Sequence, residues 1–252
     1  MKKRRTAVRP PRGIGELKER SLHAAVKKWY AVPTDRLEAR VGSYVADIER
    51  DGILVEIQTR SFGAIRRKLR DLLAANRVRL VHPIAKRKWI VRVSKKGKEL
   101  SRRRSPKEGK PADIFTELVS IPDLARHPNF SLDVLMTEEE ELRCDDGRGS
   151  WRRGGVSVVD HRLVSVINRV ELHGPEDYAR FLPAGLPSPF TNRDLAAAGG
   201  VGIALARRMT YCLKRIGTIR EVGKRGLQLL FTPLPPGSGN LVNRGNAKPQ
   251  GR

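Results

Sequence analysis

The sequence predicts an α/β protein, with a mixed sheet flanked by helices and a smaller unit near the C-terminus. Two observations indicate the sheet region: helically spaced apolar residues alternate with short apolar runs, and two of these runs flank an Asp51-Gly52 pair that favours a tight hairpin. The third observation is residues 183–189, PAGLPSP, whose composition is typical of a linker. The 252 residues suffice for one large or two modest domains.

Composition limits the function. The chain has 51 Lys and Arg against 27 Asp and Glu, a net charge of +24, which indicates a polyanionic partner, nucleic acid first and an anionic membrane surface as the alternative. No apolar run approaches the ~18 residues of a spanning helix, so we expect no membrane insertion. The two cysteines lie far apart without metal-ligand spacing, which argues against zinc and fits a cytoplasmic location. The basic start lacks the apolar stretch of a secretory signal.

The first region is expected to contain a helix, three strands, a helix and a strand. Residues 1–13 are interpreted as a disordered basic arm. The first helix would bury Leu22, Ala25, Val26 and Trp29, which have helical spacing. The expected elements are at residues 15–30, 37–41, 44–50, 53–60, 62–75 and 78–81, with a further strand at 88–93.

The hairpin places two acids together. A two-residue loop at Asp51 and Gly52 fixes the register, so Asp47 and Glu56 lie opposite each other with Cβ atoms about 4.5–5.5 Å apart. Gln58 shares the face of Glu56, because side chains alternate along a strand. Opposed carboxylates repel unless a cation lies between them, and magnesium takes carboxylate oxygens. The alternative is a solvated hairpin with acids on its exposed face.

These residues resemble the core of the PD-(D/E)XK nuclease superfamily, which has the restriction-endonuclease-like fold. That family has an Asp at the end of one strand and acid-x-Lys on the next, often with an acid on a preceding helix. Asp47 matches the Asp, Glu56-Ile57-Gln58 matches the acid-x-Lys, and Glu19 matches the helix acid. The resemblance covers residues 14–93, and Gln58 departs from the usual Lys, although some members carry Gln there.

The resemblance implies a metal-dependent DNA endonuclease that hydrolyses phosphodiester bonds. Asp47, Glu56 and Glu19 would hold Mg²⁺ or Mn²⁺, and Gln58 would orient the attacking water. Glu19 has an alternative role as the ion-pair partner of a neighbouring basic side chain. A second hypothesis is a catalytically inactive, nuclease-like DNA-binding regulator or accessory factor, because Gln58 cannot supply the charge of a Lys. A third is an RNA- or ribosome-associated binder.

The middle of the chain extends the first region to about residue 182. Residues 86–110 hold 12 Lys or Arg and 2 Glu, which indicates either a solvated loop or a polyanion contact. A helix is expected near 114–121 and strands at 131–136, 156–159 and 163–167. The four acids at 138–141 are interpreted as a solvated face or loop and not a metal site. His161 and His173 are expected to be ordinary surface histidines.

The C-terminal unit is expected at residues 187–232. Thr191 and Asp194 form a capping box, which begins a short helix that ends at residue 198. A Gly-Gly turn separates it from a second helix at 202–216. Strands at 219–222 and 227–231 then form a hairpin with a basic tip. This order resembles a winged helix-turn-helix. The family places its second helix in the DNA major groove and its hairpin tip against phosphate. The implied DNA contacts are Arg207, Tyr211 and Lys214 on the outer helix face, beside Thr210, and Lys224 and Arg225 on the wing.

The predicted partner is therefore duplex DNA, with no membrane, and the formation of a homodimer is left open. An alternative is that the winged helix makes protein contacts, since a fold does not fix a function. Residues 233–252 are rich in Gly, Pro and Asn and are interpreted as a disordered tail. No glycine-rich phosphate loop or Ser-His-Asp set supports nucleotide hydrolysis or acyl transfer.

Overall fold

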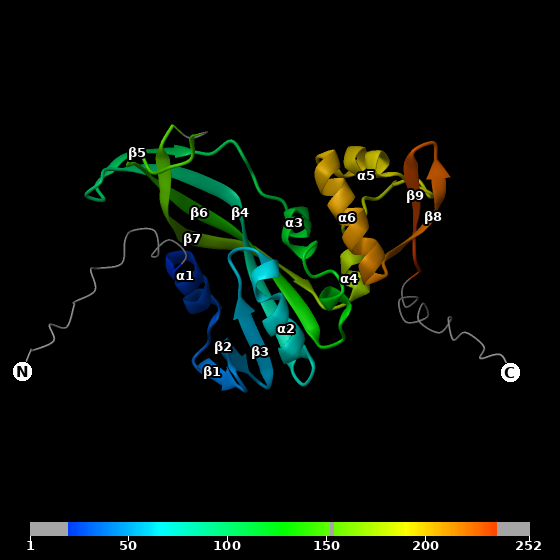
Figure 1. The fold of residues 1–252 in the computed structure, drawn as a ribbon, viewed down its shortest axis with the longest axis horizontal. Helices are drawn as coiled ribbons and strands as arrows, with labels where there is room; N and C mark the ends of the chain where they lie inside the picture. The colour runs from blue at the N-terminus through cyan, green and yellow to red at the C-terminus, as the bar shows by residue number, and fades with distance from the viewer. Residues whose placement is uncertain (1–19, 152–153, 236–252) are drawn as a thin grey trace, which may run out of the picture.

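The computed structural model describes residues 20–151 and 154–235, which form a mixed α/β structure around one large sheet (Figure 1). Seven strands form this sheet in the order β1-β2-β3-β4-β6-β7, with β5 paired to β4, and β8 and β9 form a separate two-stranded sheet. The expected mixed sheet flanked by helices is therefore confirmed. Glu19, the basic arm at 1–13 and most of the expected tail lie outside the described residues.

The first six elements follow the expected order. They are α1 (Arg20–Tyr30), β1 (Arg36–Val41), β2 (Tyr44–Arg50), β3 (Ile53–Ile57), α2 (Arg66–Leu73) after the short 3₁₀ turn η1 (Phe62–Ile65), and β4 (Arg77–Val93). β1, β2 and β3 are antiparallel neighbours, and α2 crosses over to make β4 parallel to β3. Asp51 and Gly52 have φ of 50° and 74°, the left-handed values of the predicted tight turn. Ile48 accordingly pairs with Val55, as predicted.

The second half of the sheet is built from long strands where the sequence predicted short ones. The elements are β5 (Glu99–Arg104), η2 (Pro111–Ile114), α3 (Phe115–Leu118), η3 (Leu124–Arg126), β6 (Phe130–Asp145) and β7 (Val156–Leu172). β4 was expected to end before Pro83 and instead continues through it. On one side of β4, the pairing with β3 ends at Val81 and the pairing with β5 begins at Trp89. Pro83 lies between these two pairings, where neither β3 nor β5 needs a hydrogen bond from the amide that proline lacks.

Two helices cover opposite faces of the sheet. Leu22, Val26 and Tyr30 of α1 pack on one face, whereas Leu69 and the following leucines of α2 pack on the other. Trp29, which was expected in the buried stripe, is 49% exposed, so that expectation is wrong. Tyr30 takes its place.

Tyr30 is held by a polar cluster between α1 and the long strands. Its hydroxyl donates to the fully buried Asp133 of β6, which Arg169 of β7 also contacts at 2.7 Å. The guanidinium groups of Arg50 and Arg169 each lie 5.2 Å from the centre of the Tyr30 ring. This cluster fixes the C-terminal end of α1 against the sheet.

The C-terminal elements are α4 (Pro175–Ala179), α5 (Asn192–Gly199), α6 (Ile203–Ile216), β8 (Ile219–Arg225) and β9 (Gln228–Pro233). The capping box of Thr191 and Asp194 is present as predicted. One apolar cluster joins these elements to α3 and the sheet, with Met209 of α6 and Phe115 of α3 among its members. The boundary expected at about residue 182 therefore does not separate two apolar cores. Within the described ranges, no helix is long and apolar enough to cross a membrane.

The segment after β5 is anchored at two successive residues. The amide of Gly109 donates to the carbonyl of Ala85 on β4 at 3.0 Å, and a Cβ at position 109 would lie 2.5 Å from that oxygen. Only glycine fits this approach. Lys110 then donates from Nζ to the carbonyl of Gly200 at 2.8 Å, in the turn between α5 and α6.

Candidate functional site

Asp47 of β2 is held by α1. Its Oδ2 accepts a hydrogen bond from the Ile57 amide at 2.9 Å and lies 3.2 Å from Nε2 of His23. Its Oδ1 lies 3.4 Å from Nζ of Lys27. Burial acts to raise the pKa of Asp47, but the bonds from His23 and Ile57 outweigh it and hold the pKa below its usual value. The hydrogen bond to Asp47 likewise raises the pKa of His23.

Glu56 of β3 is held instead by α2. Nζ of Lys68 lies 2.7 Å from both carboxylate oxygens, and Glu56 is almost fully buried. Oε1 nevertheless has no hydrogen bond of acceptable geometry among the described residues. Burial raises the pKa of Glu56 to about 7, against the opposing effect of Lys68, and the nearby charge of Asp47 raises it further.

The expectation that Asp47 and Glu56 face each other without neutralisation is wrong. The paired register of β2 and β3 ends at Ile48 and Val55, and the amide of Ile57, two residues beyond Val55, bonds the Asp47 side chain. Each acid therefore has basic partners from a different helix. Lys68 places a positive charge beside Glu56. Gln58, which stands where the acid-x-Lys motif usually has Lys, cannot supply that charge.

Gln58 follows the end of β3, and its side chain bonds the turn that comes after the strand. Its side-chain Nε2 donates to the carbonyl of Ser61 at 2.8 Å, and its own carbonyl accepts from Nδ1 of His82 at 2.5 Å. Glu19, the expected third acid, lies outside the described residues. Of the expected catalytic residues, the structure therefore brings Asp47 and Glu56 near each other, and the Gln58 side chain bonds the Ser61 carbonyl.

A cavity of about 600 Å³ adjoins this position. His23 and Lys27 of α1, Gln58, and Glu38 of β1 all contribute to its lining. Glu38 forms an ion pair with Lys27 and has φ of 51°, a left-handed value that is uncommon for a residue other than glycine. Such backbone strain persists where surrounding contacts enforce it, often at functional sites.

A divalent cation does not fit this arrangement as it stands. The unsatisfied Oε1 of Glu56 is one acceptor, but both oxygens of Asp47 are already engaged, and His23, Lys27 and Lys68 bring positive charge to the same place. No group of three or more His, Cys, Asp or Glu is arranged to hold a metal within the part of the chain that the structure describes. The magnesium site stays a prediction.

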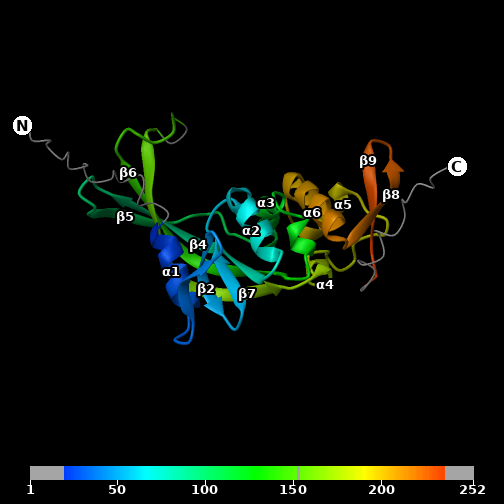
Figure 2. The same ribbon diagram turned by 60° about the horizontal axis from the view of Figure 1, so that its bottom comes forward.

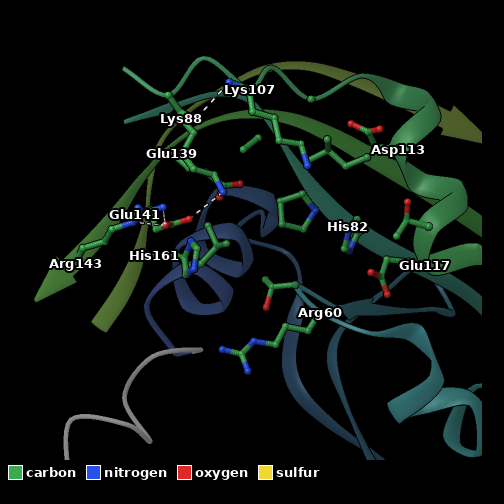
Figure 3. Close-up of a pocket in the computed structure, with 18 residues that line it drawn as sticks. Arg60, His82, Lys88, Lys107, Asp113, Glu117, Glu139, Glu141, Arg143 and His161 are labelled. Atoms are coloured by element: carbon green, nitrogen blue, oxygen red, sulfur yellow. Dashed lines mark hydrogen bonds and ion pairs between the residues drawn. The ribbon is translucent and has the colours of Figure 1, made fainter. Parts of the chain in front are cut away.

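A second cavity, of about 570 Å³, lies beside the first (Figure 3). Thr59 and Arg60 line both. The expectation that the acids at 138–141 form a solvated face is wrong for two of them, because Glu139 and Glu141 are buried and face this cavity. Side chains alternate between the two faces of a strand, so Glu139 and Glu141 point to one face of β6 and Glu138 and Glu140 point to the other. This alternation is the signal that sequence reasoning missed.

Opposite charges surround Glu141 in this cavity. Lys88 of β4 lies 3.0 Å from its carboxylate, and Arg143 of β6 lies 2.6 Å away. Burial raises the pKa of Glu139, although the Thr137 hydroxyl donates to it. The polar lining is therefore largely paired internally.

Two histidines line the same cavity, so His161 is not the ordinary surface residue expected (Figure 3). Burial lowers the pKa of His161 and lowers that of His82 to about 4. His82 is therefore neutral near pH 7. Because its Nδ1 donates to the Gln58 carbonyl, its Nε2 carries no proton.

The expected nucleic-acid contacts on α6 are exposed. Arg207, Tyr211 and Lys214 all lie on the solvent side of the helix. The guanidinium of Arg215 lies 5.9 Å from the centre of the Tyr211 ring, and Lys214 pairs with Glu221 of β8 at 2.9 Å. The helix therefore presents several positive charges and one aromatic ring on a single face.

The hairpin residues Lys224 and Arg225 are also exposed, and Arg225 pairs with Asp194 of α5 at 3.1 Å. Thr210 was expected on the outer face of α6, which is wrong. It is buried, and its hydroxyl donates to the side chain of Asn192. That bond fixes α6 against the start of α5.

Comparison with known proteins gives a family without an assigned activity. An uncharacterized protein of Treponema pallidum (strain Nichols) is 32% identical over 226 residues, which cover 89% of each chain. No solved structure matches the protein. Residues 20–173, from α1 to just beyond β7, match the family model described as a domain of unknown function, DUF8091. This match covers more than half of the protein, which therefore belongs to the DUF8091 family.

Proposed function

We propose that the protein binds duplex DNA, and that its C-terminal helices and hairpin act as a winged helix-turn-helix. The observation that carries this proposal is the exposed face of α6, with Arg207, Tyr211 and Lys214 side by side at helical spacing. An α-helix fits the major groove of B-DNA, where Arg reads base edges and Lys contacts phosphate.

The packing of α6 supports this role. Its opposite face, with Ala206, Met209 and Leu213, is buried against the rest of the molecule, so the basic face is free for a partner. Lys224 lies on the adjacent hairpin, where it would meet phosphate. The net charge of +24 favours association with a polyanion at long range.

Two neighbouring arginines provide a matched test. Arg207→Ala should weaken binding to a preferred duplex by about tenfold or more, because a base contact by Arg is worth about 1–3 kcal/mol. Arg208→Ala is the control, since Arg208 is also exposed but donates to Thr116 of α3 at 3.3 Å. Fluorescence anisotropy over a range of salt measures both, and log Kd should rise linearly with log salt.

Absence of duplex binding at low salt, or a flat salt dependence, would refute the proposal. Equal losses in the two variants would refute the assignment of α6 while leaving non-specific binding intact. Tighter binding to duplex RNA than to duplex DNA would favour the RNA-binding hypothesis instead.

A second candidate is magnesium- or manganese-dependent DNA cleavage. It is favoured by the order of the first six elements and by the proximity of Asp47 and Glu56 beside a cavity. The test is incubation of supercoiled and linear DNA with each ion, using wild type and Asp47→Asn. Cleavage that the variant loses would support catalysis. If wild type binds DNA but nicks none of these substrates, the protein is a non-catalytic DNA-binding platform.

A further inference from the structure

The edge of the sheet opposite the winged-helix unit carries a dense basic ribbon. We define the ribbon as residues 86–110, which contain the second half of β4, the turn after it, and β5. All six residues of β5 are exposed. The sequence predicted a strand at 88–93 and left residues 86–110 open as a solvated loop or a polyanion contact. In the structure β4 and β5 form an antiparallel pair here, with Trp89 opposite Arg104.

Most of the positive charge on the ribbon has no acidic partner. Of the 12 Lys and Arg, Lys88, Arg102 and Arg104 form ion pairs with acids. Lys110 donates to the Gly200 carbonyl. The remaining eight are exposed and have no ion pair to any residue that the structure describes: Lys86, Arg87, Arg92, Lys95, Lys96, Lys98, Arg103 and Lys107.

The pairing of the strands concentrates this charge. Arg92 of β4 lies directly opposite Arg143 of β6, and like charges opposed on neighbouring strands repel unless an anion lies between them. Arg103 of β5 lies opposite Ile90, two residues from Arg92, so it extends the same face. Among the residues that the structure describes, Arg143 pairs with the acid Glu141, whereas Arg92 and Arg103 have no acidic partner.

The turn of the ribbon adds three more cations. Lys95, Lys96 and Lys98 surround Gly97, whose φ of 82° the turn requires. Charges on an edge strand also prevent pairing with another sheet, and a few lysines suffice for that purpose. Eight charges without an acidic partner in the described ranges, with two arginines opposed across neighbouring strands, exceed that requirement and favour a partner with repeated negative charge.

The ribbon and α6 lie toward opposite ends of the long axis in both views, with β8 and β9 beyond α6 (Figures 1 and 2). β4 has 17 residues, and at about 3.3 Å per residue its length is about 55 Å. A DNA duplex of about 16 base pairs has the same length. We infer that the ribbon is a second DNA-binding surface, and that one duplex contacts both the ribbon and α6. This inference rests on the DNA binding proposed above.

Duplex length provides the test. A duplex of about 12 base pairs is too short to reach both surfaces, whereas one of about 36 base pairs can contact both at once. Linked contacts raise the effective affinity. Wild type should therefore bind the long duplex more tightly, by more than the number of overlapping sites accounts for.

The triple variant Lys95→Ala, Lys96→Ala, Lys98→Ala should lose most of this gain while binding the short duplex through α6. Each lost phosphate contact should reduce the salt slope by about 0.9. The control triple variant, Lys28→Ala, Arg40→Ala, Arg77→Ala, removes the same charge from exposed positions outside the ribbon. It should retain the length dependence. Circular dichroism confirms that both variants fold.

The outcomes separate this inference from the proposed function. If wild type binds neither duplex, both fail. If Arg207→Ala weakens binding but the ribbon variant keeps the full length dependence and salt slope, only the ribbon inference fails. If the control triple variant loses as much as the ribbon variant, the effect is one of total charge, and the ribbon is not a distinct surface.

Discussion

Glu56 makes the stability of the protein depend on pH in a direction that can be worked out. Its pKa is raised to about 7 from a usual value of 4.5, chiefly because it is buried. Between these values the unfolded chain has lost the proton and the folded protein keeps it. The folded state therefore binds more protons, and its contribution to the free energy of unfolding falls as pH rises from 4.5 to 7.

The size of the effect follows from the same two values. At about 1.4 kcal/mol per pH unit, the difference corresponds to about 3 kcal/mol, lost across that window and constant outside it. Glu56→Gln keeps the shape of the protonated acid but cannot ionise. We expect it to be near wild type in stability at about pH 4.5 and to gain on wild type, by a few kcal/mol, at about pH 8.

Urea denaturation at both pH values measures this difference. Glu99→Gln is the control, because Glu99 is an exposed acid on β5 and its replacement should leave the pH dependence unchanged. If the stability difference between wild type and Glu56→Gln is the same at both pH values, Glu56 is not the buried, proton-retaining acid described here. A difference of opposite sign would mean that the ion pair with Lys68 outweighs burial.

Three further predictions concern stability and reactivity. Asp47→Asn should lower the free energy of unfolding by about 1–3 kcal/mol, because Asp47 bonds two basic side chains of α1; a more stable variant in urea denaturation would instead support the unneutralised carboxylate pair expected from the sequence. Cys144 and Cys212 are buried, and burial raises the pKa of Cys212 to about 12, so a thiol reagent should label neither until denaturant is added. Phe115→Ala should lower one calorimetric transition, at a cost of about 3–5 kcal/mol, since the core is shared; two separate transitions would contradict this.

Local signals predicted the local structure well. The Asp51-Gly52 turn, the Thr191 capping box and the order of the first six elements depend on residues close in sequence. The parallel pairing of β3 with β4 followed from the helix between them. These features are set by turn chemistry, capping and periodicity, all of which are visible in a single chain.

The partners of the acids could not be predicted in the same way. Asp47 meets His23 and Lys27 because the sheet and α1 pack together, and Glu56 meets Lys68 from α2 for the same kind of reason. Pairing of this kind depends on tertiary packing and not on spacing along the chain. The long strands were missed because a proline and a run of acids were read as interruptions. Pro83 is tolerated because it lies between the stretches of β4 that pair with β3 and with β5, and two of the acids face the cavity.

Gly109 has a consequence for how the two ends of the molecule are held together. Because Gly109 has no side chain, the segment can lie against Ala85. The next residue, Lys110, donates a hydrogen bond to the carbonyl of Gly200 in the turn. A methyl group at position 109 would lie too close to the Ala85 carbonyl, so the segment would have to move away from β4 and the Lys110 bond to the turn between α5 and α6 would have to adjust. Gly109, which has no side chain, thus helps to determine how the ribbon is held relative to the C-terminal helices.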